Sequence, residues 1–190
     1  VLGFMAEAEE ATHLKQLAGR DSLTGLANRR AFDLYFRQSW CTRSRGGIPL
    51  SLILFDIDHF KLVNDKFGHT IGDRCIQKVA TSAAHIIRRD NDLAARIGGE
   101  EFAIVLPGAN TTGAQRIAES LRDRVKRSPW HEIFNDNEKS ITVSLGVGSV
   151  QPETGVCHQR FLSMTDQALY VAKKNGRNCV ISKQWANSPD

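Results

Sequence analysis

Short apolar runs along the chain predict β-strands. Positions 50–55 are apolar except for Ser51, which is typical of a central strand buried on both faces. Two further runs, 93–95 and 102–106, surround a turn that contains Gly98 and Gly99. We therefore predict a hairpin in which these glycines supply the positive φ that a tight turn needs.

Apolar residues spaced three and four apart predict helices between the strands. Aromatic residues mark a helix that stops near Ser44, and a short helix follows at 60–65. A glycine-punctuated loop at 67–73 leads to a long helix that opens at Asp73, because aspartate after glycine is a standard N-cap. The remaining predicted elements are a helix at 114–125, a strand at 141–150, a helix at 161–174 closed by Asn175-Gly176, and a strand at 179–181.

The order of these elements predicts the fold class. One central hairpin excludes a purely parallel sheet, so we predict an α/β (α+β) fold with a mixed, mainly antiparallel central sheet flanked by helices. Positions 1–20 predict a helix with a narrow apolar stripe. Such a stripe suits a coiled-coil seam that joins two copies or carries an upstream signal, and packing on its own domain is the alternative. The predicted organisation is a linker helix at 1–20, a domain at 21–183 and a tail at 184–190.

Composition narrows the class of protein. The chain has 190 residues, of which 41% are hydrophobic and 24% charged, as in a soluble globular domain. No apolar run approaches the roughly 18–20 residues of a membrane span, and no signal peptide is recognisable. We therefore expect a cytoplasmic domain without direct membrane contact. Because the chain starts at Val1, a sensory or membrane module can precede it in a longer protein.

Cysteine spacing and charge argue against two further classes of site. The four cysteines form no C-x-x-C pair, which disfavours a zinc site or a disulfide framework. The net charge is +4, and the basic residues are not interleaved with aromatics, so we expect no nucleic-acid partner.

Carboxylates stand at the ends of two predicted strands. Asp56 and Asp58 follow the run at 50–55, and strand alternation places both on one face. Glu100 and Glu101 follow the glycines of the hairpin. Acids at such an edge commonly face a ligand crevice, and glycines beside them suit a site where phosphates meet a hard cation. An ordinary hairpin with solvated acids is the alternative.

Five motifs occur along the chain, in the order DSLTGLANRR (21–30), FDIDHFKLVND (55–65), FGHTIGD (67–73), RIGGEEF (96–102) and ALYVAKKNGRN (168–178). In order and spacing they resemble the diguanylate cyclase family, the GGDEF domains. The chain has the GGEEF variant, with Glu100 where the family name has aspartate. The resemblance implies a palm-like nucleotidyl cyclase fold that condenses two GTP molecules into cyclic di-GMP and pyrophosphate.

The resemblance implies a metal site and a set of catalytic residues. Mg²⁺, with Mn²⁺ as an alternative, would be held by the carboxylates of Asp56 and Glu100 and by the backbone carbonyl of Ile57. Hard oxygen ligands suit a cation that stabilises charge as a ribose 3′-hydroxyl attacks an α-phosphate. Glu101 would hold another metal or assist deprotonation of the hydroxyl, and these two roles stay open. The implied catalytic residues are Asp56, Glu100 and Glu101.

Other positions match GTP-binding residues of the family. Asn64 and Asp73 match its guanine readers, since an amide and a carboxylate can pair with the guanine edge and discriminate against adenine. Taken alone, Asn64 is equally well a helix-surface residue and Asp73 a helix cap. The remaining positions that would contact the nucleotide are Phe60, Lys61, Gly98, Gly99, Lys173 and Arg177.

The resemblance also implies a homodimer and a second nucleotide site. One site holds one GTP, so a cyclic dinucleotide requires two facing domains. Arg89 and Asp92 match the R-x-x-D product-inhibition site, with a solvated loop as the alternative. A silent domain that binds GTP or cyclic di-GMP as an effector is the second functional hypothesis. A P-loop hydrolase is remote, because the chain has no G-x-x-x-x-G-K-[ST] sequence.

Overall fold

The structure is a computed structural model that describes residues 19–44, 47–87, 89–136, 138–152 and 157–185. Positions 1–18 of the predicted linker helix and positions 186–190 of the predicted tail lie outside the described residues. Within the described ranges, none of the helices has the length and apolar character that crossing a membrane requires.

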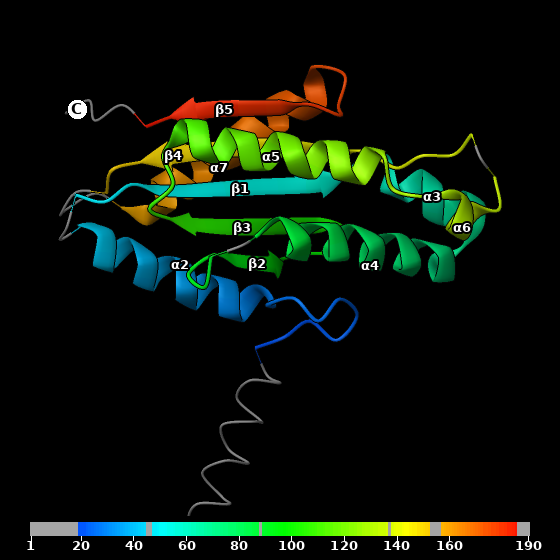
Figure 1. The fold of residues 1–190 in the computed structure, drawn as a ribbon, viewed down its shortest axis with the longest axis horizontal. Coiled ribbons are helices and arrows are strands. Elements are labelled where there is room, and N and C mark those ends of the chain that lie inside the picture. The colour runs from blue at the N-terminus through cyan, green and yellow to red at the C-terminus, as the bar shows by residue number, and fades with distance from the viewer. Residues whose placement is uncertain (1–18, 45–46, 88, 137, 153–156, 186–190) are drawn as a thin grey trace, which may run out of the picture.

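A five-stranded sheet forms the centre of the molecule (Figure 1). Its spatial order is β2-β3-β1-β4-β5, and every neighbouring pair is antiparallel except β4 with β5. The predicted mixed, mainly antiparallel sheet is therefore confirmed. The strands are β1 Leu50–Ile57, β2 Leu93–Arg96, β3 Glu101–Pro107, β4 Val143–Val150 and β5 Val180–Gln184.

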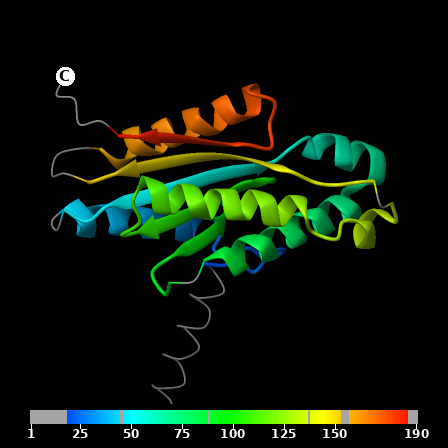
Figure 2. The ribbon, with the colours of Figure 1, turned by 45° about the horizontal axis from the view of Figure 1, so that its top comes forward.

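Helices cover both faces of this sheet. In Figure 2, α5 and α7 lie on opposite sides of the strands. The α4 helix lies on the same face as α5, and α2 lies on the same face as α7, as their buried partners indicate. The helices are α2 Arg29–Ser44, α3 Phe60–Phe67, α4 His69–Ile86, α5 Thr111–Lys126, α6 His131–Phe134 and α7 His158–Lys174.

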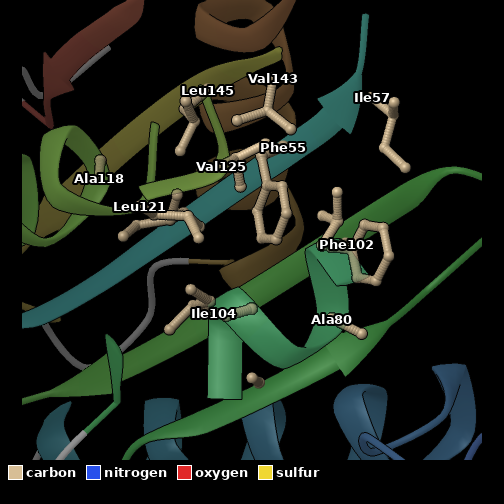
Figure 3. Close-up of a cluster of buried hydrophobic side chains, with 14 of the residues drawn as sticks. Phe55, Ile57, Ala80, Phe102, Ile104, Ala118, Leu121, Val125, Val143 and Leu145 are labelled. Carbon is tan, nitrogen blue, oxygen red and sulfur yellow. The ribbon is translucent and has the colours of Figure 1, made fainter. Parts of the chain in front are cut away.

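Alternation along β1 divides the core into two layers. All eight residues of β1 are buried. Ile53 and Phe55 pack toward α4 and α5, whereas Leu52 and Leu54 pack toward α2 and α7. The rings of Phe55 and Phe102 stack with centroids 5.0 Å apart, at the centre of the first layer (Figure 3).

The start of α4 differs from the prediction. Gly68 has φ +81° and is both the C-cap of α3 and the N-cap of α4, so most of the predicted loop at 67–73 is helical. A single glycine at positive φ is enough to break one helix and begin the next. Asp73 is consequently inside α4 rather than at its N-cap, and it is exposed. The predicted capping role of Asp73 is wrong.

Other boundaries differ by a few residues. The first strand extends to Ile57, so that Asp56 belongs to the strand itself. The strand β4 starts at Val143, two residues later than predicted, and ends at Val150 as predicted. The strand β5 starts one residue later than predicted and extends to Gln184. The short helix α6 was not predicted, because four residues are too few for a periodic pattern.

The stacked phenylalanines generate a stability prediction. Phe102→Ala removes a ring that is only 1% exposed, and we expect a loss of about 3–5 kcal/mol in the free energy of unfolding, measured by urea denaturation. Leu34→Ala in α2 is the control, because Leu34 is 57% exposed and should cost less than about 0.5 kcal/mol. Equal effects of the two substitutions would contradict this description of the core.

Candidate active site

Acidic residues from β1 and β3 meet at one end of the sheet. Asp56 lies directly opposite Glu101 on β3 and opposite Ser144 on β4. Residues opposite one another in an antiparallel pair direct their side chains to the same face. The backbone N–H of Ile57 also donates to the carbonyl oxygen of Glu100 at 3.3 Å. The two acidic strand ends are therefore adjacent.

Burial and neighbouring charges shape the electrostatics around Asp56. The residue is 8% exposed, and its Oδ2 lies 2.9 Å from the Nζ of Lys173 in α7. Burial raises the pKa of Asp56 to about 6, although the hydrogen bond and positive charge of Lys173 work in the opposite direction. Negative charge on Glu100 and Glu101 adds to the increase. A buried carboxylate beside two others is a group that attracts a cation.

The hairpin glycines serve a different purpose from the predicted one. Neither Gly98 nor Gly99 has a positive φ, so the predicted conformational reason for the glycine pair is wrong. A Cβ at Gly98 would instead lie 2.5 Å from Oε2 of Glu101, whereas a Cβ at Gly99 would meet nothing within 4 Å. Gly98 therefore makes room for a carboxylate of the site, and Gly99 leaves open space beside the backbone.

An arginine fixes the shape of the hairpin. The guanidinium of Arg96 donates to the carbonyl oxygens of Gly98 and Gly99 at 3.1 and 3.0 Å. It also donates to both carboxylate oxygens of Asp21 at 3.2 Å. Burial works against ionisation of Asp21, but hydrogen bonds from Thr24 and Arg96 hold its pKa below the ordinary value. The sequence motif that starts at Asp21 is thus attached to the acidic hairpin, a link that its spacing alone does not indicate.

The two predicted guanine readers lie on adjacent helices. Asn64 comes from α3 and Asp73 from α4, one residue after Gly72. The Oδ1 atom of Asn64 is buried and has no hydrogen-bond partner among the described residues. A Cβ at Gly72 would lie 2.0 Å from that atom, so only glycine leaves space for it. An unsatisfied buried acceptor calls for an explanation, and a ligand donor is one.

The remaining predicted positions lie near the same end of the sheet. Phe60 is buried at the start of α3, and Lys61 beside it is exposed. Arg177 is exposed and has φ +65° in the turn that follows α7. Asp58 was predicted to face the ligand together with Asp56, but its carboxylate accepts hydrogen bonds from Thr142, Ser144 and Asn178. Its oxygens are therefore already used within the protein.

Arg89 and Asp92 line a separate pocket of about 620 Å³. The pocket also contains Gly108, which follows the far end of β3, and Arg116 from α5. At about 3.3 Å per residue, the length of β3 separates this pocket from Glu101 by roughly 20 Å. Sequence analysis missed Arg116, because its position on a helix resembles that of any exposed basic residue.

The donor atoms at the end of β1 fit a hard cation. Asp56, Glu100 and Glu101 supply carboxylates, and the segment that joins Asp56 to Asp58 supplies backbone carbonyls. Across the described ranges, no three His, Cys, Asp or Glu side chains are close enough together to form a complete metal site by themselves. Such a site would therefore combine fewer side chains with backbone and ligand oxygens, as is common for Mg²⁺.

Comparison with protein families places this geometry in context. The family model described as "Diguanylate cyclase, GGDEF domain" matches residues 18–179. The response regulator PleD of Caulobacter vibrioides is 39% identical over 171 residues, which are 90% of this chain and 37% of PleD. A diguanylate cyclase of Vibrio cholerae is 41% identical over 175 residues, which are 90% of this chain and 52% of that protein. The chain thus spans about a third to a half of these relatives.

Solved structures have the same fold. The coiled coil and GGDEF domain of DgcB from Caulobacter crescentus, in complex with c-di-GMP, aligns with a TM-score of 0.85 and 32% identity, covering 96% of this chain and 94% of that one. The active GGEEF domain of a diguanylate cyclase from Vibrio cholerae aligns with a TM-score of 0.77 and 36% identity, covering 85% of this chain and 99% of that one.

The raised pKa of Asp56 predicts a pH dependence of stability. The pKa rises from 3.8 to about 6 on folding, so between these values the folded protein holds a proton that the unfolded chain releases. The corresponding stability is present below about pH 4 and is lost as the pH rises through 6. In metal-free buffer, we expect the wild type to lose on the order of 1–2 kcal/mol relative to Asp56→Asn between pH 4 and 7.

Urea denaturation at several pH values measures this difference. Asp166→Asn, which alters an exposed carboxylate in α7, is the control and should follow the wild type. If the wild type gained stability relative to Asp56→Asn over the same pH range, the pKa of Asp56 would not be raised in the folded protein.

Proposed function

The chain belongs to the diguanylate cyclase family of GGDEF domains, and we propose that it condenses two GTP molecules into cyclic di-GMP with release of pyrophosphate. The observation that carries the proposal is the position of Asp56 directly opposite Glu101, with Glu100 hydrogen-bonded through its backbone to Ile57. The GGEEF form of the signature is compatible with turnover, since a solved Vibrio cholerae domain that has the same five-residue signature is described as active.

Asp56, Glu100 and the carbonyl of Ile57 would hold Mg²⁺ or Mn²⁺. When bound, the ion would neutralise charge on the phosphates as the 3′-hydroxyl attacks. The Nζ of Lys173 lies 2.9 Å from Oδ2 of Asp56. When the metal ion binds Asp56, Lys173 would bind a phosphate oxygen instead of this carboxylate. Together with Lys61 and Arg177, it would hold the triphosphate. Glu101 lies on the same face as Asp56 and would hold a second ion or accept the hydroxyl proton.

Asn64 and Asp73 would read the guanine base. The buried Oδ1 of Asn64 can accept a hydrogen bond from the base, and an exposed carboxylate on the neighbouring helix can accept from the N1 and N2 hydrogens of guanine. Adenine has an acceptor at N1, so it would leave the carboxylate opposed by a lone pair. A site built in this way discriminates because the wrong base leaves polar groups of the site without a hydrogen-bond partner. Phe60 and the hairpin backbone at Gly98 and Gly99 would line the nucleotide pocket.

Two copies of the domain would have to face each other. Each copy would present the 3′-hydroxyl of its own GTP to the α-phosphate held by its partner, because the described acidic and basic groups form one site per chain. A homodimer is therefore part of the proposal, and the linker segment before residue 20 would govern how often two domains meet.

The pocket with Arg89 and Asp92 would bind the product. Arg89, from the loop between α4 and β2, and Arg116, from α5, line the same pocket of about 620 Å³, which is large enough for part of a cyclic dinucleotide. Guanidinium groups bind phosphate in a forked geometry and stack on bases, and a carboxylate can pair with guanine. We propose that occupation of this pocket inhibits turnover.

Incubation with GTP and Mg²⁺, followed by chromatography, tests the proposed activity. We expect cyclic di-GMP from the wild type and a fall of at least about 100-fold in rate for Glu100→Gln, since a hard metal ligand is removed. Asp166→Asn is the matched carboxylate-to-amide control and should keep the wild-type rate and melting temperature. GTP binding without turnover in the wild type would favour the effector alternative.

Product inhibition gives a second test. Arg89→Ala should raise the inhibition constant for cyclic di-GMP by about tenfold or more, with an initial rate within about twofold of the wild type, because one charge-assisted contact is lost. Arg124→Ala removes an exposed arginine of α5 outside the pocket and should leave inhibition unchanged. Inhibition of Arg89→Ala at wild-type concentrations of product would show that the pocket is not the inhibitory site.

A further inference from the structure

The turn between α7 and β5 has an unusual backbone. Gly176, Arg177 and Asn178 are consecutive and have φ values of +97°, +65° and +46°. Glycine adopts such values freely, but residues with a Cβ rarely do. Strained residues of this kind persist only where the surroundings fix them, and they are concentrated at functional sites. The contacts of this turn therefore call for examination.

Three hydrogen bonds fasten the turn. The N–H of Arg177 donates to the carbonyl oxygen of Ala172 at 3.1 Å, which closes the end of α7. The side-chain oxygen of Asn178 accepts from Arg122 of α5 at 3.2 Å. The N–H of Asn178 donates to Oδ2 of Asp58 at 3.0 Å. This last bond joins the turn to a segment 120 residues earlier in the chain.

The contacts of Asp58 join the turn after α7 to the start of β4. It is 5% exposed, and besides Asn178 it accepts from Thr142 Oγ1 at 2.7 Å and from Ser144 Oγ at 2.6 Å. Its own N–H donates to the carbonyl oxygen of Thr142 at 2.9 Å. Asp58 follows Asp56 by two residues, and in Figure 2 the turn after α7 lies at the same end of the sheet as the tip of β1.

We propose that Asp58 is a positioning residue for triphosphate binding. It holds the strained turn, and with it Arg177 and the end of the helix that carries Lys173, at a fixed distance from the strand end that carries Asp56. The inference rests on the proposed function, in which Lys173 and Arg177 hold the phosphates. Asp58 itself does not touch the nucleotide. Without it, the turn relaxes toward ordinary φ values and the cations lose their alignment.

Selective loss of phosphate affinity is the signature of this role. In Asp58→Ala we expect KM for GTP to rise about tenfold, because the turn loses the charge-assisted bond that fixes it. The affinity for a non-hydrolysable GTP analogue with Mg²⁺, measured by calorimetry, should fall by a similar factor. The affinity for GMP, which lacks the two outer phosphates, should change less than about twofold. A residue that only stabilised the fold would weaken both ligands equally.

Three further variants sharpen the test. Asp58→Asn can keep all three bonds, since its amide nitrogen can donate to the Ser144 hydroxyl while its oxygen still accepts from Asn178, so we expect KM within about threefold of the wild type. Ser149→Ala is the control for stability. It removes a buried hydroxyl that lies 2.7 Å from the hydroxyl of Ser51, at the other end of β4. Asp58→Ser, too short to reach Asn178, replaces Asp58→Ala if that variant fails to melt cooperatively.

The outcomes separate this inference from the proposed function. A fall in affinity for the GTP analogue that exceeds the fall for GMP at least fivefold, with recovery in Asp58→Asn, supports the positioning role. Equal losses for both ligands, unchanged affinity, or the same losses in Ser149→Ala overturn it. Failure of the wild type to make cyclic di-GMP contradicts the proposed function instead, and the calorimetric comparison still decides the role of Asp58 because it needs no turnover.

Discussion

The register between β1 and β3 is the constraint on which the site depends. Because Asp56 lies opposite Glu101, their side chains share a face, and Phe55 opposite Phe102 fills the core on the other face. A slip of one residue would turn the side chains of one strand to the opposite face, so that Glu101 would no longer share a face with Asp56 and Phe102 would no longer share one with Phe55. The hydrophobic core therefore enforces the geometry of the acidic groups. Packing and chemistry are specified by the same strand pairing.

The acidic end of the sheet is stabilised by groups that come from distant parts of the chain. Lys173 compensates the buried charge of Asp56, and Arg96 binds the hairpin carbonyls and Asp21 together. Gly98 and Gly72 contribute by the absence of a side chain, since each leaves room for a polar atom of its neighbour. Burying charged and polar groups costs free energy unless partners are supplied. Here the partners also connect the acidic hairpin to the loop that starts at Asp21 and connect β1 to α7.

Local patterns were sufficient for the sheet but not for every contact of the site. The apolar run of β1 and the two runs around the hairpin predicted strands and their acidic ends, because burial imposes those patterns directly. The start of α4 was misplaced, since one glycine at positive φ, Gly68, can separate two helices without a loop. The positions of Arg116 in a pocket wall and of Asp58 in a hydrogen-bond network depend on residues from other elements, and no local pattern records such contacts. The family resemblance identified Lys173 as a phosphate-binding position, but it did not indicate that Lys173 pairs with Asp56.

The order of the strands has a consequence for synthesis on the ribosome. Among the strands of the described residues, β1 is the first to be made, yet its two neighbours, β3 and β4, come from later segments that end at Pro107 and Val150. All of its residues are buried in the finished domain. Until Val150 has left the ribosome, one edge of this apolar strand has no partner, and unpaired apolar strands aggregate readily. The central place of β1 in the sheet is therefore completed only after the segment up to Val150 has been made.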